Sequence, residues 1–375
     1  MDREAARAAP APALHGAGTT PAIVFVTRKY PPAVGGMEVL ARLVGDALER
    51  VGPTTRITLG HSQRHLLWFL PWAALRTALS LARGGVGRIV CGDPVVLVAL
   101  LPVLWIRRPK VAVVVHGLDL VYPNPLYRSV VRRALRRADT VLAISAATRV
   151  EAARLGVPEH RLFTVRPAVE QPPLPSEPRG DRRAALCRRL GIDPDHDVVV
   201  TLGRLIPRKG ARWFVEHVAP LLRERTHYVV AGSGPDLEPV LEAVIARGLG
   251  GRVHVLGAVD EPLRDALLGA ADVFVMPNVP IPGDMEGFGL VAVEAALWGT
   301  PVVAARLEGI EDAVAEGETG LLCPPGDAAA FAAAIGSLLA LRPEERQALG
   351  ERYAAEAARR YGVDRLAEVV ARALA

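Results

Sequence analysis

The sequence predicts two doubly wound, Rossmann-like α/β domains that lie in tandem and face a central cleft. Its 375 residues are typical of two domains, and half of them are hydrophobic, which is enough for two packed cores. Short apolar runs rich in β-branched residues alternate with amphipathic helical patterns, as in parallel β-α-β units. In such sheets ligands bind beyond the carboxyl ends of the strands, so we expect the functional site in the cleft.

The first domain is expected at residues 21–170. Residues 1–20 are rich in Ala, Pro and Gly and lack an apolar run, so they predict a disordered tail rather than a signal peptide. A loop with two consecutive glycines separates the first strand from a helix with Met37, Leu40 and Val44 on one face. The strands of this domain are predicted at 23–27, 88–91, 111–115, 140–144 and 162–165.

The second domain is expected at residues 183–354, after a proline-rich linker at 171–182. The alternation of strands and helices starts again there. A last helix runs from about 343 to 375, and we expect its end, from about 355, to pack back on the first domain. The strands of the second domain are predicted at 198–202, 228–231, 253–256, 273–276 and 302–304.

Cysteine usage and hydropathy exclude several classes of protein. Cys91, Cys187 and Cys323 are far apart and show neither CxxC nor Cys/His spacing, which argues against a disulfide framework or a structural zinc site and fits a reduced, cytoplasmic setting. The longest apolar stretch, residues 94–106, is shorter than the roughly 18 residues that a membrane-spanning helix needs, and Pro102 interrupts it.

The net charge of +5 conceals an asymmetry between the two halves. Residues 1–180 carry a net charge of +12 and residues 181–375 a net charge of −7. A basic half beside an acidic half predicts that the first half meets an anionic partner. A phosphorylated acceptor, an anionic membrane surface and nucleic acid all remain open at this point.

The first motif is DMEGFGLVAVE, at residues 284–294 after a predicted strand. Its two glutamates, Glu286 and Glu294, are eight residues apart, one in a glycine-rich loop and the other in the helix that the loop opens. A helix N-terminus offers free N–H groups to a phosphate, and Gly287 and Gly289 let the backbone approach it closely. We expect Glu286 to accept hydrogen bonds from sugar hydroxyls and Glu294 to accept them from a ribose diol. The alternative for Glu294 is a solvent-facing position, but its apolar neighbours predict a buried segment, where a glutamate needs a partner.

The second motif is GRLIPRKG, at residues 203–210 directly after a predicted strand. Arg204 offers a planar fork to phosphate oxygens and Lys209 a compact charge, so both can reach a diphosphate leaving group. Lys209 is one of only three lysines in the chain, which weighs against the alternative of an ordinary solvated turn. We expect Arg208 to lie on the surface.

Together the two motifs resemble those of the retaining GT-B glycosyltransferases of glycosyltransferase family four. The resemblance rests on Gly-Arg-x4-Lys-Gly followed by Glu-x7-Glu, and it covers nearly the whole second domain. In the first domain it is patchy, and residues 167–170, PAVE, depart from the family's usual Pro-Gly-Val-Asp at the hinge. The catalytic residues that it implies are His116, Arg204, Lys209 and Glu286. The donor-binding residues that it implies are Gly35, Gly36, Gly232, Gly234, Val259, Gly287, Phe288, Gly289, Leu290 and Glu294.

In the first domain the resemblance rests on a loop and a histidine. Gly35 and Gly36 resemble the family's glycine loop, and two glycines before a helix form an anion-accepting turn. His116, directly after a predicted strand, matches the family's active-site histidine near the sugar. A common loop and a structural histidine are the alternatives. Lys29 and Asp119 are further candidates for contacts with the acceptor.

The resemblance also implies a mechanism, which is front-face transfer with retention of configuration. No carboxylate of the enzyme attacks, and the leaving diphosphate, stabilised by Arg204 and Lys209, takes the proton of the acceptor hydroxyl. We expect no Asp-x-Asp metal site, no bound metal and no other cofactor.

Two stretches of the first domain concern the acceptor. Residues 66–75 are apolar with two tryptophans and flanking arginines, and residues 127–137 form a basic amphipathic helix that includes Arg132, Arg133 and Arg136. Both suit peripheral attachment to an anionic membrane, here at the inner face of the cytoplasmic membrane. An ordinary packed helix with a solvated charged face explains each stretch as well.

The sequence therefore predicts transfer of a hexose-type sugar from a nucleotide-sugar to a hydroxyl of a glycan, glycolipid or lipid-linked acceptor, in polysaccharide or glycolipid synthesis. The alternatives are a GT-B sugar-nucleotide epimerase, a catalytically dead sugar-nucleotide binder and a basic nucleic-acid-binding protein. The Glu-x7-Glu spacing disfavours the first and the intact motifs the second. We expect no nucleic-acid partner, because no motif of interleaved aromatic and basic residues is visible.

Overall fold

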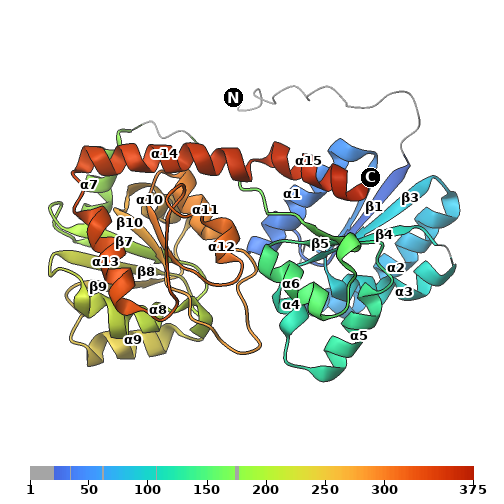
Figure 1. Cartoon of the computed structure of the whole chain (residues 1–375), viewed down its shortest axis with the longest axis horizontal. Coiled ribbons are helices and arrows are strands. Elements are labelled where there is room, and N and C mark those ends of the chain that lie inside the picture. The colour runs from blue at the N-terminus through green and yellow to red at the C-terminus, as the bar shows by residue number, and fades with distance from the viewer. Residues whose placement is uncertain (1–20, 34, 61–62, 107, 174–176) are drawn as a thin grey trace.

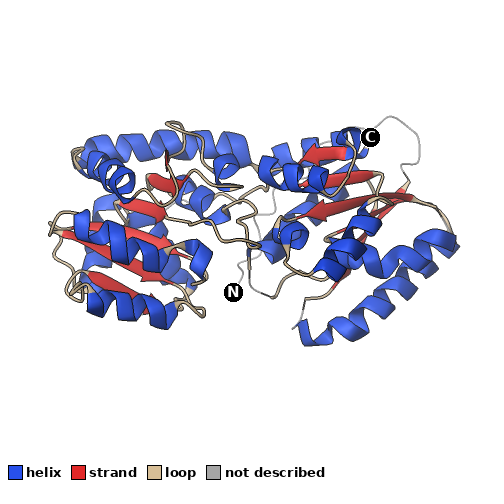
Figure 2. Cartoon of the chain, turned by 60° about the horizontal axis from the view of Figure 1, so that its bottom comes forward, coloured by secondary structure: helices blue, strands red, loops and turns tan. Residues whose placement is uncertain are grey.

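The computed structural model describes residues 21–375 except 34, 61, 62, 107 and 174–176, so the predicted tail and part of the predicted linker lie outside the described residues. The chain forms two parallel six-stranded sheets with helices on both faces of each (Figures 1 and 2). This arrangement confirms the prediction of two doubly wound α/β domains.

The first sheet has the strand order β2-β1-β3-β4-β5-β6, so the chain reverses its direction of growth beside β1. The strands are β1 (Ala22–Thr27), β2 (Thr54–Thr58), β3 (Val86–Cys91), β4 (Lys110–Val115), β5 (Thr140–Ala143) and β6 (Leu162–Thr164). Strand β2 was not predicted, because its residues, TTRIT, are mostly polar. An edge strand can have such a composition because only one of its sides pairs with another strand.

The second sheet has the order β12-β11-β10-β7-β8-β9. The strands are β7 (Asp197–Leu202), β8 (Thr226–Ala231), β9 (Val253–Gly257), β10 (Val273–Met276), β11 (Val302–Ala305) and β12 (Leu321–Cys323). Strand β12 was not predicted either, because a three-residue edge strand is too short for a periodic pattern. The central strands β7 and β10 are almost wholly buried, as their unbroken apolar runs predict.

Helices connect the strands in both domains. The first eight are α1 (Gly36–Val51), α2 (Leu66–Arg83), α3 (Pro94–Ile106), α4 (Leu118–Val121), α5 (Pro125–Leu135), α6 (Ala146–Arg154), α7 (Arg179–Leu190) and α8 (Ala211–Trp213). The others are α9 (Leu237–Ala246), α10 (Glu261–Ala270), α11 (Leu290–Leu297), α12 (Ile310–Ala313), α13 (Ala328–Leu339), α14 (Pro343–Tyr361) and α15 (Val363–Leu374). Short 3₁₀ turns lie at Gln63–His65, Glu159–Arg161, Pro207–Lys209 and Ala219–Leu221, and a π-helical turn at Phe214–Val218.

Helices α2, α3 and α5 form one layer on the first sheet, with α3 in contact with both of the others. Helix α3 is the apolar stretch noted in the sequence, and it continues through Pro102 rather than breaking there. Among the described residues, no helix is both long and apolar enough to cross a membrane.

The two domains are tied together by the C-terminal helices. Helix α14 packs against α11 of the second domain, and α15 packs against α1 of the first (Figure 1). The expected return to the first domain therefore takes place, but it begins at Gly362, between two helices, rather than near residue 355 within a single one. Helix α7 already begins at Arg179, so the end of the predicted linker is helical.

Candidate active site

The cleft lies where the carboxyl ends of the strands of both sheets meet. A Cβ added at Gly287, in the loop that follows β10, would collide with the backbone oxygen of His116, which follows β4. A Cβ added at Gly36 would lie 3.0 Å from the side chain of Leu290. The structure thus brings together the predicted residues of the two domains, and glycine permits the close approach.

The centre of the site is the carboxylate of Glu286. Its Oε2 accepts hydrogen bonds from the guanidinium of Arg208, from Nζ of Lys209 at 2.6 Å and from Nδ2 of Asn278 at 3.1 Å. Burial alone would raise the pKa of Glu286, but the positive charges of Lys209 and Arg208 outweigh it and hold the pKa below its usual value. Glu286 is therefore ionised at neutral pH.

The backbone around Glu286 is fixed as firmly as its side chain. Its N–H donates to the carboxylate of Glu308 at 2.5 Å, and its carbonyl accepts from the N–H of Gly309 at 3.1 Å. Glu308 has a φ of 51°, in the left-handed region that side chains other than glycine rarely adopt. Burial raises the pKa of Glu308. Such a strained residue next to a cleft is a mark of a functional site.

The prediction that Arg208 lies on the surface is wrong. Arg208 is buried, and besides Glu286 it contacts the carboxylate of Asp284 at 3.0 Å. The sequence showed the basic turn but not which of its side chains points inward. The 3₁₀ turn Pro207–Lys209 and Gly210 in the left-handed region direct both Arg208 and Lys209 toward Glu286.

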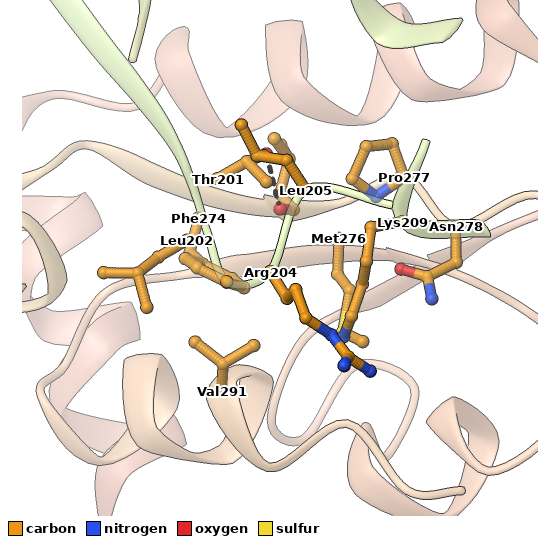
Figure 3. Close-up of a pocket in the computed structure, with 12 residues that line it drawn as sticks. Thr201, Leu202, Arg204, Leu205, Lys209, Phe274, Met276, Pro277, Asn278 and Val291 are labelled. Atoms are coloured by element: carbon orange, nitrogen blue, oxygen red, sulfur yellow. Dashed lines mark hydrogen bonds between the residues drawn. The ribbon is translucent and has the colours of Figure 1, made fainter. Parts of the chain in front are cut away.

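Arg204 points into the cleft without an ion-pair partner among the described residues. It lines a narrow cavity of ≈ 10 Å³ together with Lys209 and Asn278, and Figure 3 shows the three side chains extending toward the same side of this cavity. An exposed guanidinium beside an ammonium group is suited to bind a diphosphate. The cavity itself has room for about one water molecule.

The glycine turn after β8 supports this wall from behind. Gly232 and Gly234 have φ values of 149° and 154°, and a Cβ on either would collide with the backbone of Gly203 or Leu205 in the turn that follows β7. Val259, after β9, is only partly buried and remains a predicted donor contact. The two turns are thus packed backbone to backbone.

Phe288, a predicted donor contact, lies beside the cleft with its side chain in the core. Its side chain is buried and packs edge-on against Tyr361 of α14, with ring centroids 5.8 Å apart. It therefore braces the loop from the core and leaves only its backbone to contact a donor. Gly289 has a φ of 97° and precedes α11, whose first residue is Leu290, as the motif predicted for a helix opened by a glycine loop.

Glu294 lies in α11, where its side chain is partly exposed and forms an ion pair. Its Oε2 contacts the guanidinium of Arg264, from α10, at 2.6 Å. Arg264 was not among the predicted residues, because a position in a neighbouring helix leaves no signal in the local motif. The predicted partner of the glutamate exists, and it leaves the carboxylate at the edge of the cleft, partly exposed.

In the wall of the first domain, His116 has a defined tautomer. Its Nε2 lies 2.8 Å from the carbonyl oxygen of Gly92, which can only accept, so Nε2 carries the hydrogen. Its Nδ1 is buried and has no partner in the described part of the chain. Asp119 holds the turn by accepting from the N–H of His116 at 3.0 Å, and burial raises the pKa of Asp119.

The glycine loop also lies at the cleft. Gly35 is the N-cap of α1, and Glu38, one turn into the helix, folds back beside it and contacts Nζ of Lys29 at 3.4 Å. Lys29 thus meets a carboxylate of its own domain, and its contact with an acceptor remains a prediction.

A second cavity, of ≈ 310 Å³, opens between the domains beside this site. It is lined by α6 of the first domain and by the loop that precedes Glu286. Its charged residues are Glu151, Arg154, Asp284 and Glu308, so acidic groups predominate. The volume falls at the lower end of the usual range for ligand pockets.

Aspartates in Asp-x-Asp spacing do occur, in DPDHD at residues 193–197, which the sequence analysis overlooked. This segment ends at the first residue of β7, at the amino edge of the sheet, whereas the site lies at the carboxyl edge. Among the described residues, no group of three or more His, Cys, Asp or Glu is arranged to hold a metal ion.

The two stretches predicted to concern the acceptor lie on the outer helical layer of the first domain. In α2, Trp68, Trp72, Leu75 and Leu79 follow one another at helical spacing and are all exposed, Trp68 to 82%. Helix α2 buries Phe69 and Ala73 on its other face, so it is a packed helix whose exposed face is apolar as well as charged. Helix α5 buries Val131 and Leu135 and exposes its arginines, so it fits a packed helix with a charged face.

Two facing doubly wound domains with a cation-rich, glycine-lined cleft define the GT-B class of fold. Two family models match the chain: one described as glycosyl transferases group 1 matches residues 196–341, and one described as Glycosyltransferase Family 4 matches residues 13–171. The chain belongs to this family of glycosyltransferases.

Relatives and solved structures agree with this assignment. The chain is 35% identical over 246 residues to the GDP-mannose-dependent alpha-(1-6)-phosphatidylinositol monomannoside mannosyltransferase of Mycolicibacterium smegmatis, a match that covers 63% of this chain and 62% of the relative. It is 39% identical over 198 residues to the D-inositol 3-phosphate glycosyltransferase of Geodermatophilus obscurus, covering 50% and 42%. The chain thus matches less than two thirds of the length of these relatives.

Among solved structures, HepE from Anabaena in complex with UDP and glucose superposes with a TM-score of 0.73 at 20% identity, covering 94% of this chain and 98% of that one. Sucrose-phosphate synthase from Thermosynechococcus elongatus gives 0.73 at 22%, with the same coverage. At these identities the likeness confirms the fold.

Proposed function

We propose that the chain is a retaining glycosyltransferase that moves a hexose-type sugar from a nucleotide-sugar to a hydroxyl of a glycan, glycolipid or lipid-linked acceptor. The observation that carries this proposal is the gathering of Arg204, Lys209 and Glu286 at one point of the cleft, opposite His116. The cations suit a diphosphate, and the carboxylate and imidazole suit sugar hydroxyls. The comparisons favour this function over the epimerase and the nucleic-acid-binding alternatives.

In the proposed reaction the bond between the anomeric carbon and the diphosphate oxygen breaks. The acceptor oxygen bonds to the same carbon from the same face, and its proton moves to the departing diphosphate. Arg204 and Lys209 stabilise the charge that develops on the leaving group, which is the largest catalytic contribution that this site can make. Lys209 contacts Glu286 before the donor binds, so it is already placed at the point where this charge appears.

The donor is identified by thermal shift with UDP-, GDP- and ADP-sugars. GDP-mannose comes first, because the relative from Mycolicibacterium smegmatis is named for it. NMR of the product should show the anomeric configuration of the donor retained, and activity should survive EDTA, because no metal or other cofactor is proposed. Inversion, or loss of activity in EDTA, would refute the mechanism, and binding of no sugar-nucleotide at all would refute the function.

We propose that the acceptor reaches the site through the cavity of ≈ 310 Å³ between α6 and the loop that precedes Glu286. Its mostly acidic lining suits an uncharged, hydroxyl-bearing end of the acceptor rather than a phosphate. The excess positive charge of the first domain then serves a different part of the acceptor, or the surface that carries it.

We propose that the surface that carries the acceptor is the anionic inner face of the cytoplasmic membrane. The exposed stripe of α2 supplies apolar side chains, and Arg76, whose guanidinium lies 5.9 Å from the ring centre of Trp72, adds a charge beside it. Trp105 of α3 is 70% exposed, and Arg137 lies 5.3 Å from its ring. Tryptophan and arginine are the residues suited to the headgroup level, and each basic residue there contributes about 1 kcal/mol.

Co-sedimentation with liposomes tests this surface. Binding should require anionic lipid, fall with added salt and weaken when Arg132, Arg133, Arg136 and Arg137 become Ser or when Trp68 and Trp72 become Ser. The control replaces the exposed Arg352 and Arg359 of α14 with Ser, which removes charge elsewhere. If the protein stays in the supernatant with anionic liposomes at low salt, a soluble phosphorylated acceptor is the better explanation.

A further inference from the structure

Asn278 is a buried residue of the cleft to which neither motif assigns a role. It follows β10 by two residues, so it stands at the carboxyl edge of the second sheet, and its side chain is 1% exposed. It lines the cavity of Arg204 and Lys209, as Figure 3 shows. A Cβ added at Gly210 would collide with the carbonyl of Pro277, so the backbone around Asn278 is tightly held.

The orientation of the Asn278 amide is fixed by its neighbour. Glu286 is ionised, because Lys209 and Arg208 hold its pKa below the usual value, and an ionised carboxylate only accepts hydrogen bonds. The group that faces it at 3.1 Å must therefore be the NH₂ of Asn278. The amide oxygen, Oδ1, consequently points away from Glu286.

This Oδ1 is buried and has no hydrogen-bond partner in the described part of the chain. A buried polar atom without a partner is destabilising, and such atoms are rare in folded proteins. Oδ1 can only accept, so the group that would satisfy it must be a donor. A hydroxyl is such a donor, whereas a phosphate oxygen is not.

Glu286 offers a second acceptor beside it. The three contacts to its carboxylate from Arg208, Lys209 and Asn278 all fall on Oε2, and Oε1 receives no hydrogen bond from the described residues. One hydrogen bond joins the two side chains. Together they present two oxygen acceptors, one charged and one neutral, at the point where the sugar of the donor would lie.

We propose that Asn278 is a sugar-reading residue, whose Oδ1 accepts a hydrogen bond from a hydroxyl of the transferred sugar while its Nδ2 holds Glu286 in place to accept another. The ligand class is a nucleotide-sugar with hydroxyls on neighbouring ring carbons. This inference rests on the proposed function. It adds a residue that contacts the sugar part of the donor and not its nucleoside diphosphate part.

Equilibrium binding of two pairs of probes tests the inference: GDP with GDP-mannose, and UDP with UDP-glucose. For the pair that the wild-type protein binds, Asn278→Ala should raise the Kd of the nucleotide-sugar by roughly three- to tenfold, the effect of one lost hydrogen bond. The Kd of the nucleoside diphosphate should change less than twofold. Asn124→Ala is the matched control, because Asn124, the only other asparagine of the chain, caps α5 outside the cleft.

Deoxy derivatives of the bound nucleotide-sugar give a second test. It uses the wild-type protein, so it does not depend on whether an Asn278 variant folds. The wild-type protein should lose the same three- to tenfold in affinity with the derivative that lacks the hydroxyl read by Oδ1. Asn278→Ser, which keeps a small polar group, should discriminate less between this derivative and its parent.

The outcomes separate the inference from the function beneath it. If the wild-type protein binds none of the four probes, the proposed function fails and the inference with it. If the wild-type protein binds a nucleotide-sugar but Asn278→Ala binds it equally well, or weakens both members of the pair by the same factor, only the inference is overturned. If no single-deoxy derivative binds the wild-type protein more weakly than the parent, it is overturned as well.

Discussion

The two walls of the cleft are built from different chemistry. The wall of the second domain is dense in charge, with Arg208, Lys209 and Asn278 converging on one carboxylate oxygen of Glu286. The wall of the first domain offers backbone, the imidazole of His116 and charged groups that pair within their own domain, such as Lys29 with Glu38. In the proposed function, this difference assigns binding of the anionic donor to the second domain and binding of the acceptor to the first.

The largest effect is expected where charge develops in the reaction. Arg204→Ala and Lys209→Ala should each lower kcat by about 10²–10³-fold, the usual cost of one lost stabilising donor in an active site. Steady-state kinetics measure this, with Lys110→Ala as the control, since Lys110 is an exposed lysine at the start of β4. A kcat near the wild-type value in either variant would mean that the second wall does not neutralise the leaving group.

The charged wall should also be sensitive to pH. Because the folded-state pKa of Glu286 is lowered, the stability that its ionised form contributes is present above its ordinary pKa and is lost as the pH falls through the folded-state pKa. Arg208→Ala should therefore lower the free energy of unfolding by about 1.5–3 kcal/mol at pH 7, and by less below about pH 4.

Denaturant unfolding of the wild type and the variant at pH 7 and at pH 3.5 measures this difference. Arg204→Ala is the matched control, an arginine of the same turn that has no carboxylate partner among the described residues, and it should change stability much less. A loss of stability in Arg208→Ala that is equal at both pH values would show that the loss does not come from the pairing with ionised Glu286.

How far the sequence predicts this wall can be seen in a single turn. Arg204 and Lys209 follow β7 as the strand pattern requires, and the glycines and glutamates of residues 284–294 open α11 as the motif requires. The inward direction of Arg208 depends on a 3₁₀ turn whose shape is set by contacts with distant segments, so no local pattern of residues indicates it.

The hydrogen-bond and ion-pair partners of Glu286 and Glu294 were not predicted either, because they come from distant segments of the chain. Asn278 and Glu308 meet Glu286 only after the loops fold together, and Arg264 meets Glu294 from another helix. The order of strands and helices follows from local periodicity, whereas these pairings are tertiary. The exposed stripe of α2 also has the composition of a buried helix, and only the structure separates the two.

A smaller effect is expected at the edge of the charged wall. Glu294→Ala should raise the Kd of the nucleotide-sugar by removing hydrogen bonds to the ribose, and a charged hydrogen bond is worth about 1.5–3 kcal/mol, or roughly 10- to 150-fold. Partial exposure of Glu294 favours the lower end of this range. Titration calorimetry with the nucleotide and the nucleotide-sugar should show the same loss for both, because both carry the ribose. An unchanged Kd in a correctly folded variant would contradict the assignment.

The smallest effect concerns the contact that keeps the two walls together. The buried carboxylate of Asp312, in α12 of the second domain, accepts from Arg166 at 2.7 Å and from the N–H of Ala146, at the start of α6 of the first domain, at 2.5 Å. Asp312→Asn keeps the shape of the side chain but removes its charge, so the closed arrangement should be less populated. A ligand that binds only the closed arrangement then binds more weakly by the same fraction. We expect KM for the donor to rise about two- to fivefold with kcat little changed.

Asp364→Asn is the control, because its pair with Arg50 joins α15 to α1 at the surface, where ion pairs contribute little. If Asp312→Asn lowers kcat as strongly as Lys209→Ala does, closure is part of the chemical step, and the division between the two walls does not hold.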